Sequence, residues 1–132
     1  MNKIHNVTIV DDDKLFAFIT KKAIESTNLV EQIRIFGNGL EAITFLMDSI
    51  NNHEPLPDII LLDLNMPIMD GWQFLEEFIV LPPRLNKKIL VYVVSSSIAE
   101  QDIERAKALS SVSDFIVKPV SKDKILHVLK NL

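Results

Sequence analysis

Residues 59–63 read Ile-Ile-Leu-Leu-Asp, a continuous apolar run that is closed by a carboxylate. A strand that is buried on both faces has this pattern, because none of its side chains needs to face water. Residues 89–94 (ILVYVV) repeat the pattern and are followed by a run of serines. Both segments predict central strands of a parallel sheet that helices cover on each side.

On both sides of residues 59–63, segments with strand patterns alternate with segments with helix patterns along the whole chain. Further strands are predicted at Ile4–Val10, Gln32–Phe36 and Asp114–Val117. A helix is expected after each strand, and the ranges are Lys14–Thr27, 40–50, Trp72–Leu81, Glu100–Leu109 and the segment between Ser121 and Leu132. A closed barrel of eight such units needs about 250 residues. The sequence therefore predicts a single α/β domain with an open, doubly wound (βα)5 parallel sheet.

The predicted helices carry signals for where they begin and end. Asp12 or Asp13 is placed to cap the start of the first helix, and Ser121 the start of the last. Pro82 and Pro83 are expected to end the third helix, because proline lacks the N–H that a helix interior needs.

The first helix has a strongly apolar sequence. Leu15, Phe18, Ile19 and Ala23 recur at helical spacing, which predicts the face that packs on the sheet. Phe16 and Phe18 cannot both face one core, so one of these two rings is expected at the surface.

Composition excludes several classes of protein. The chain has 132 residues, of which 48% are hydrophobic and 24% charged, with no cysteine and a formal net charge of −4. This apolar fraction excludes disorder, and no run approaches the roughly 20 apolar residues of a membrane span. The acid excess argues against nucleic-acid binding, and the chain lacks the glycine motifs that cradle nucleotide phosphates. The absence of cysteine fits a reducing, cytoplasmic setting.

Polar residues follow the predicted strands at the points where the strands end. They are Asp11, Asp12 and Asp13 after the first strand, Asp63 after the third, Ser95 to Ser97 after the fourth and Lys118 after the fifth. In open α/β sheets, ligands bind outside these carboxyl ends. Several carboxylates without a nearby histidine suit Mg²⁺, and a lysine and a hydroxyl beside them suit phosphoryl oxygens. Asp63 is the best candidate for a nucleophile that forms an aspartyl phosphate.

Each of these residues also has a purely structural interpretation. The acidic run at 11–13 could cap a helix, Lys118 could be a surface lysine, and serines often form turns. Asp63 is different, because a carboxylate that ends a buried strand is costly without a partner. The coincidence of complementary groups at several strand ends favours a functional site.

The chain resembles the receiver domains of two-component response regulators, of the chemotaxis-regulator type, along essentially its whole length. The matching segments are VDDD at 10–13, LLDLNMPIMDG at 61–71, VVSSS at 93–97 and VKP at 117–119. The resemblance implies a flavodoxin-like fold. It also implies a phosphorylatable signalling switch that assists its own phosphorylation and dephosphorylation, rather than an enzyme.

The resemblance further implies a role for each matching residue. Asp63 would be the phosphoacceptor, which receives a phosphoryl group from a phosphohistidine on a sensor histidine kinase or a histidine phosphotransfer protein. Mg²⁺ would be bound by Asp12, Asp63 and the backbone carbonyl of Asn65, with Asp11 acting through water.

The remaining matches concern the switch itself. Ser95 would be the switch hydroxyl, with Ser96 as the fallback within the serine run. Lys118 would pair with the phosphoryl group, Pro119 would follow a cis peptide bond, and Phe115 would be a rotating aromatic ring. The added charge of the phosphoryl group would draw the hydroxyl and the ammonium inward. The face formed by the fourth helix, the fifth strand and the fifth helix would then change shape.

Two other functions compete with this interpretation. A haloacid-dehalogenase-like phosphatase also uses a strand-end aspartyl nucleophile and Mg²⁺, but it places a second aspartate where this chain has Asn65, which cannot shuttle a proton. A binding module that keeps only the fold is disfavoured by the complete set of acids, hydroxyl and lysine. Residues 1–132 are expected to form a receiver without an output domain, which signals to an unidentified protein target, unless the chain is a fragment.

Overall fold

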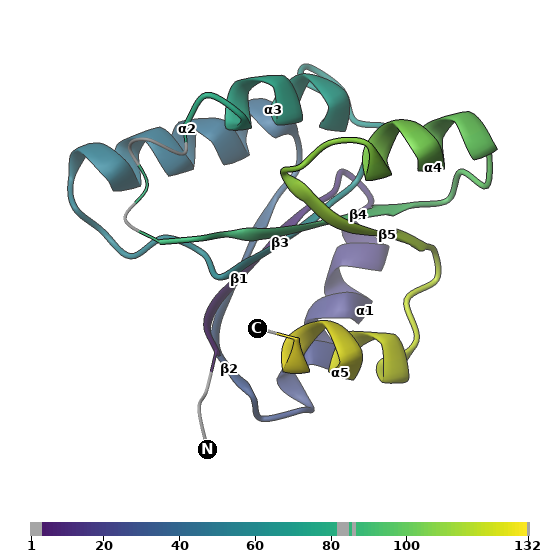
Figure 1. The fold of residues 1–132 in the computed structure, drawn as a ribbon. Coiled ribbons are helices and arrows are strands. Elements are labelled where there is room, and N and C mark those ends of the chain that lie inside the picture. The colour runs from purple at the N-terminus through teal and green to yellow at the C-terminus, as the bar shows by residue number, and fades with distance from the viewer. Residues whose placement is uncertain (1–3, 82–84, 86, 132) are drawn as a thin grey trace.

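The computed structural model describes residues 4–81, 85 and 87–131, and within these residues five strands alternate with five helices (Figure 1). The strands are β1 (Ile4–Val10), β2 (Val30–Phe36), β3 (Ile59–Leu62), β4 (Leu90–Ser95) and β5 (Val112–Val117). The helices are α1 (Lys14–Glu25), α2 (Gly39–Asn51), α3 (Gly71–Phe78), α4 (Glu100–Lys107) and α5 (Lys122–Lys130). The strands pair in parallel in the order β2-β1-β3-β4-β5. The predicted open, doubly wound sheet is confirmed.

Two hydrophobic cores lie on opposite faces of the sheet. Helices α2, α3 and α4 cover one face, and α1 and α5 cover the other (Figure 1). Strand β3 serves both cores, because Ile60 and Leu62 point into the first and Ile59 and Leu61 into the second. All four residues of β3 are buried, which explains why its sequence has no polar alternation. Every helix in the described part of the chain is too short or too polar to cross a membrane.

Most predicted boundaries lie within a few residues of those in the structure. Asp13, rather than Asp12, caps α1, because its Oδ1 accepts a hydrogen bond from the Phe16 N–H at 3.0 Å. Ser121 caps α5 in the same way, through the Lys124 N–H at 3.1 Å. Helix α3 ends at Phe78 instead of continuing to residue 81. The predicted stop at residues 82 and 83 lies outside the described residues, as does residue 132.

The predicted buried face of α1 is right for Ala23, which packs against the core, but wrong for the three larger residues. Leu15, Phe18 and Ile19 are 69%, 54% and 57% exposed. The side chains that face the core are those of Ala17, Thr20 and Ile24. The buried residues recur at helical spacing as predicted, but they lie on a different side of the helix. Small side chains let the helix approach the sheet closely, whereas a pattern based on hydrophobicity favours the larger apolar residues beside them.

Candidate functional site

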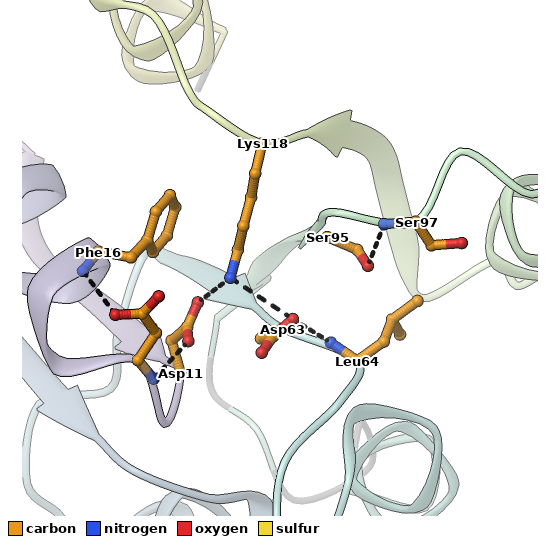
Figure 2. A network of polar contacts seen from close by, with 8 residues as sticks. Asp11, Phe16, Asp63, Leu64, Ser95, Ser97 and Lys118 are labelled. Carbon is orange, nitrogen blue, oxygen red and sulfur yellow. Dashed lines mark hydrogen bonds and ion pairs between the residues drawn. The ribbon is translucent and has the colours of Figure 1, made fainter.

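The carboxyl edge of the sheet gathers the residues that follow β1, β3 and β5. Asp11, Asp63 and Lys118 each come directly after one of these strands, and their side chains converge (Figure 2). The backbone N–H of each residue extends the ladder of its strand by one hydrogen bond. The accepting carbonyls, each at 2.9 Å, belong to Phe36, Val10 and Ser95 respectively. The sheet itself therefore fixes where the three side chains begin.

The Lys118 ammonium lies between the two carboxylates. Its Nζ is 2.8 Å from Asp11 Oδ2 and 3.8 Å from Asp63 Oδ1. Both aspartates are buried, with 3% and 6% of their surface exposed. A buried carboxylate is costly unless it is paired. Lys118 supplies one positive charge for two negative ones, so the pocket keeps an excess negative charge.

The pKa of Asp63 lies above that of an ordinary aspartate. Burial raises its pKa from 3.8 to about 6, and the Asp11 carboxylate contributes to this rise. Lys118 and the backbone N–H groups of Leu64 and Asn65 lower the same pKa. The Leu64 N–H donates to Asp63 Oδ1 at 2.9 Å. A cation bound beside Asp63 would relieve the cost of ionising it.

The raised pKa predicts that Asp63→Asn stabilises the metal-free protein at neutral pH. Well below pH 3.8, Asp63 is neutral in both the folded and the unfolded state, so it carries no ionisation penalty. As the pH rises from about 4 to about 6, the unfolded chain ionises while Asp63 in the folded protein stays protonated, and the wild-type protein loses up to about 3 kcal/mol of stability. The amide cannot ionise, so the variant avoids this loss.

Urea unfolding in a chelating buffer would measure this difference. The free energy of unfolding of the variant should exceed that of the wild-type protein at pH 7.5, and the gap should shrink at pH 4.5. Titrating groups that do not interact with Asp63 cancel in the comparison between the two proteins. A gap of the same size at both pH values would contradict the assigned environment of Asp63.

Three carboxylates form a potential cation site. One oxygen from each of Asp11, Asp12 and Asp63 lies within 4.8 Å of the other two. Oxygen donors with excess negative charge suit a hard cation such as Mg²⁺, so the donor set fits the expected metal. Asn65, whose backbone carbonyl is the further expected ligand, lies exposed on the loop two residues after Asp63.

The three serines that end and follow β4 lie in three different environments. Ser95 is fully buried, and its Oγ accepts a hydrogen bond from the Ser97 N–H at 3.1 Å. Ser96 is exposed. The Ser97 hydroxyl donates to Asp102 Oδ2 of α4 at 2.8 Å. Ser95, which is buried, contacts Ser97 (Figure 2), and Ser97 in turn links it to α4 through Asp102.

Two more of the expected site residues lie on β5 and just after it. Phe115 is 8% exposed, and its ring belongs to the core that α2, α3 and α4 cover. The peptide bond between Lys118 and Pro119 is cis. The ring of Phe115 thus faces the core and not the open pocket.

Sequence reasoning missed the aromatic side of the pocket. The centroid of the Phe16 ring lies 4.2 Å from Lys118 Nζ. Phe16 comes three residues after the capping Asp13, in the first turn of α1. Side chains of a helix lean toward its N-terminus, and the start of α1 lies at the pocket. This position was the available signal for a contact with the site.

Comparisons with known proteins agree with this geometry. Residues 7–130 match the family described as "Response regulator receiver domain". The chain is similar to the chemotaxis protein CheY of Listeria monocytogenes, with 30% identity over 122 residues that cover 92% of each chain. It is also similar to the crystal structure of a two-component response regulator from Cytophaga hutchinsonii, with a TM-score of 0.88, 31% identity and coverage of 98% of this chain and 96% of the other.

A third similar protein is solved with a metal ion. It is the CheX–CheY–BeF3–Mg²⁺ complex from Borrelia burgdorferi, with a TM-score of 0.74, 28% identity and coverage of 93% of this chain and 84% of the other. The family match spans nearly the whole chain, and the fold and the acidic strand ends agree with it. The chain therefore belongs to the response regulator receiver domains of two-component signalling.

Proposed function

We propose that the protein accepts a phosphoryl group on Asp63 in a Mg²⁺-dependent reaction and that this modification switches its signalling surface. The observation that carries the proposal is the environment of Asp63: a buried carboxyl group at the end of the central strand, 3.8 Å from Lys118 and raised in pKa to about 6. Asn65 disfavours a phosphatase of the haloacid-dehalogenase type, since that chemistry needs a second carboxyl group at this position.

In the proposed reaction an oxygen of Asp63 attacks the phosphorus of the donor, and the bond between phosphorus and the leaving group breaks. The Lys118 ammonium pairs with an oxygen of the transferred group. Asp12, Asp63 and the carbonyl of Asn65 would bind Mg²⁺, with Asp11 acting through water, and the ion would supply positive charge to the phosphoryl oxygens. The pocket assists its own modification and reversal, so the protein is a switch rather than an enzyme with a separate substrate.

The hydrogen bonds of Ser95 indicate how the modification reaches the surface. When its hydroxyl turns toward the bound phosphoryl group, the Ser97 N–H loses its acceptor, which it holds at 3.1 Å. Ser97 in turn holds Asp102 of α4 at 2.8 Å. Movement at Ser95 therefore biases the loop before α4 and the position of that helix. Phe115, buried under α4, would repack in response.

An apolar rim around the pocket supports a protein as the phosphoryl donor. We define this rim as Leu15, Ile68 and Ile98, which are 69%, 75% and 78% exposed. They lie after β1, β3 and β4, so all three border the same edge of the sheet. Ile68 also has a backbone φ of 69°, a conformation that is rare for a β-branched residue. Such a rim suits docking of a histidine kinase or a histidine phosphotransfer protein.

Incubation with acetyl phosphate tests the proposal without a partner protein. With Mg²⁺, intact-mass spectrometry should show an adduct of about 80 Da. Addition of a chelator should prevent its formation. Failure to form the adduct with Mg²⁺, or equal formation with the chelator, would overturn the proposed function.

A further inference from the structure

The Lys118 ammonium has a third neighbour besides the two carboxylates. The Phe16 ring lies beside it, with the centroid 4.2 Å from Nζ (Figure 2). A cation within about 6 Å of an aromatic face is attracted by the electron density of the ring. The side chain of Lys118 is only 16% exposed, so water screens this attraction weakly.

Both partners of this contact have fixed backbones. The Phe16 N–H donates to the Asp13 side chain at 3.0 Å, which anchors the first turn of α1. The Lys118 N–H donates to the Ser95 carbonyl at 2.9 Å, which anchors the end of β5. The flexible part is the four-carbon stem of the lysine. The ring limits the directions in which this stem can point.

A ring and a carboxylate hold an ammonium in different ways. Asp11 is the nearer carboxylate, at 2.8 Å against 3.8 Å for Asp63, and it draws Nζ away from the reacting residue. The Phe16 ring is neutral and offers no hydrogen-bond acceptor. It can therefore restrain the ammonium over the pocket and leave its N–H donors available to phosphoryl oxygens.

We propose that Phe16 is a positioning residue for phosphorylation, because its ring holds the Lys118 ammonium between Asp11 and Asp63. This inference rests on the proposed function of Asp63. Phe16 acts through Lys118 and forms no bond to the transferred group. An aliphatic side chain of similar bulk could fill the same space, but it would not attract the charge.

Substitution of the ring separates attraction from bulk. Phe16→Leu should lower the initial rate of adduct formation from acetyl phosphate and Mg²⁺ by about three- to tenfold. Phe16→Tyr and Phe16→Trp keep an aromatic face and should stay within about twofold of the wild-type rate. Phe18→Leu is the matched control. The Phe18 ring lies on the same helix but contacts Lys22, whose Nζ is 5.4 Å from the ring centroid. This variant should form the adduct at the wild-type rate.

A second measurement needs neither metal nor donor. In the metal-free protein, NMR signals of the Lys118 methylene next to Nζ should be shifted upfield by the ring. Phe16→Leu should abolish this shift, and Phe16→Tyr should keep it. A wild-type protein without the shift, a wild-type rate in Phe16→Leu, or a failure of both aromatic variants to restore the rate would overturn the inference.

The two proposals fail in different ways. A wild-type protein that forms no adduct refutes phosphorylation of Asp63 and the positioning role together. If the wild-type protein forms the adduct and Phe16→Leu forms it equally fast, only the positioning role is refuted.

Discussion

Asp63→Asn is expected to abolish the adduct of about 80 Da that acetyl phosphate and Mg²⁺ produce. The amide has no negative charge and is not a nucleophile at neutral pH, and it also removes one carboxylate from the cation site. The fold should survive, because the amide oxygen can still accept the hydrogen bond that the Leu64 N–H now donates at 2.9 Å. Lys118 also keeps its closer partner, Asp11, at 2.8 Å.

Asp58→Asn provides the matched control for this loss. Asp58 directly precedes β3 and Asp63 directly follows it, so the two substitutions change the two ends of one strand. Asp58 pairs with Lys87 at 2.8 Å, at the edge opposite the pocket. This variant should form the adduct at the wild-type rate. Intact mass after equal incubation compares the two, and an adduct of equal yield in Asp63→Asn would place the phosphoryl group on another residue.

The core of the site could be predicted from sequence because a parallel sheet imposes it. Once Ile59–Leu62 is identified as a central parallel strand, the residues that follow the strands must meet at one edge. Asp11, Asp63 and Lys118 follow from the strand ends alone, without knowledge of the strand order. The structure adds that the Lys118 ammonium lies closer to Asp11 than to Asp63. This difference depends on the conformation of the flexible lysine side chain.

The parts that could not be predicted depend on the direction of side chains and on backbone conformation. The buried side of α1 was predicted wrongly because two small residues, Ala17 and Thr20, face the sheet. The contact of Phe16 with Lys118 joins residues about a hundred positions apart, and no local pattern encodes it. The φ of 69° at Ile68 is a further feature that the sequence pattern did not predict. The Met69 N–H donates to the Pro67 carbonyl at 2.7 Å and closes a tight turn around it.

Gly71→Ala should destabilise the protein strongly, for a reason that also concerns the pocket. Gly71 begins α3, and its N–H donates to the Leu64 carbonyl at 2.9 Å. A Cβ on Gly71 would lie 2.8 Å from Leu64 Cα and would overlap the Asp63 carbonyl oxygen. Both are backbone atoms, so no side chain can turn aside to make room. The loop that carries Asp63 would have to move away from α3.

We expect Gly71→Ala to lower the free energy of unfolding by about 3 kcal/mol, which is a large share of the stability of a small domain. Gly37→Ala is the matched control, because a Cβ on Gly37 would meet nothing within 4 Å. Its free energy of unfolding should change by less than about 0.5 kcal/mol. Urea unfolding of the two variants measures the difference, and equal midpoints would contradict the close approach of α3 to the residue after β3. Because the displaced atoms belong to Asp63 and Leu64, the folded fraction of Gly71→Ala should also form the adduct more slowly than Gly37→Ala.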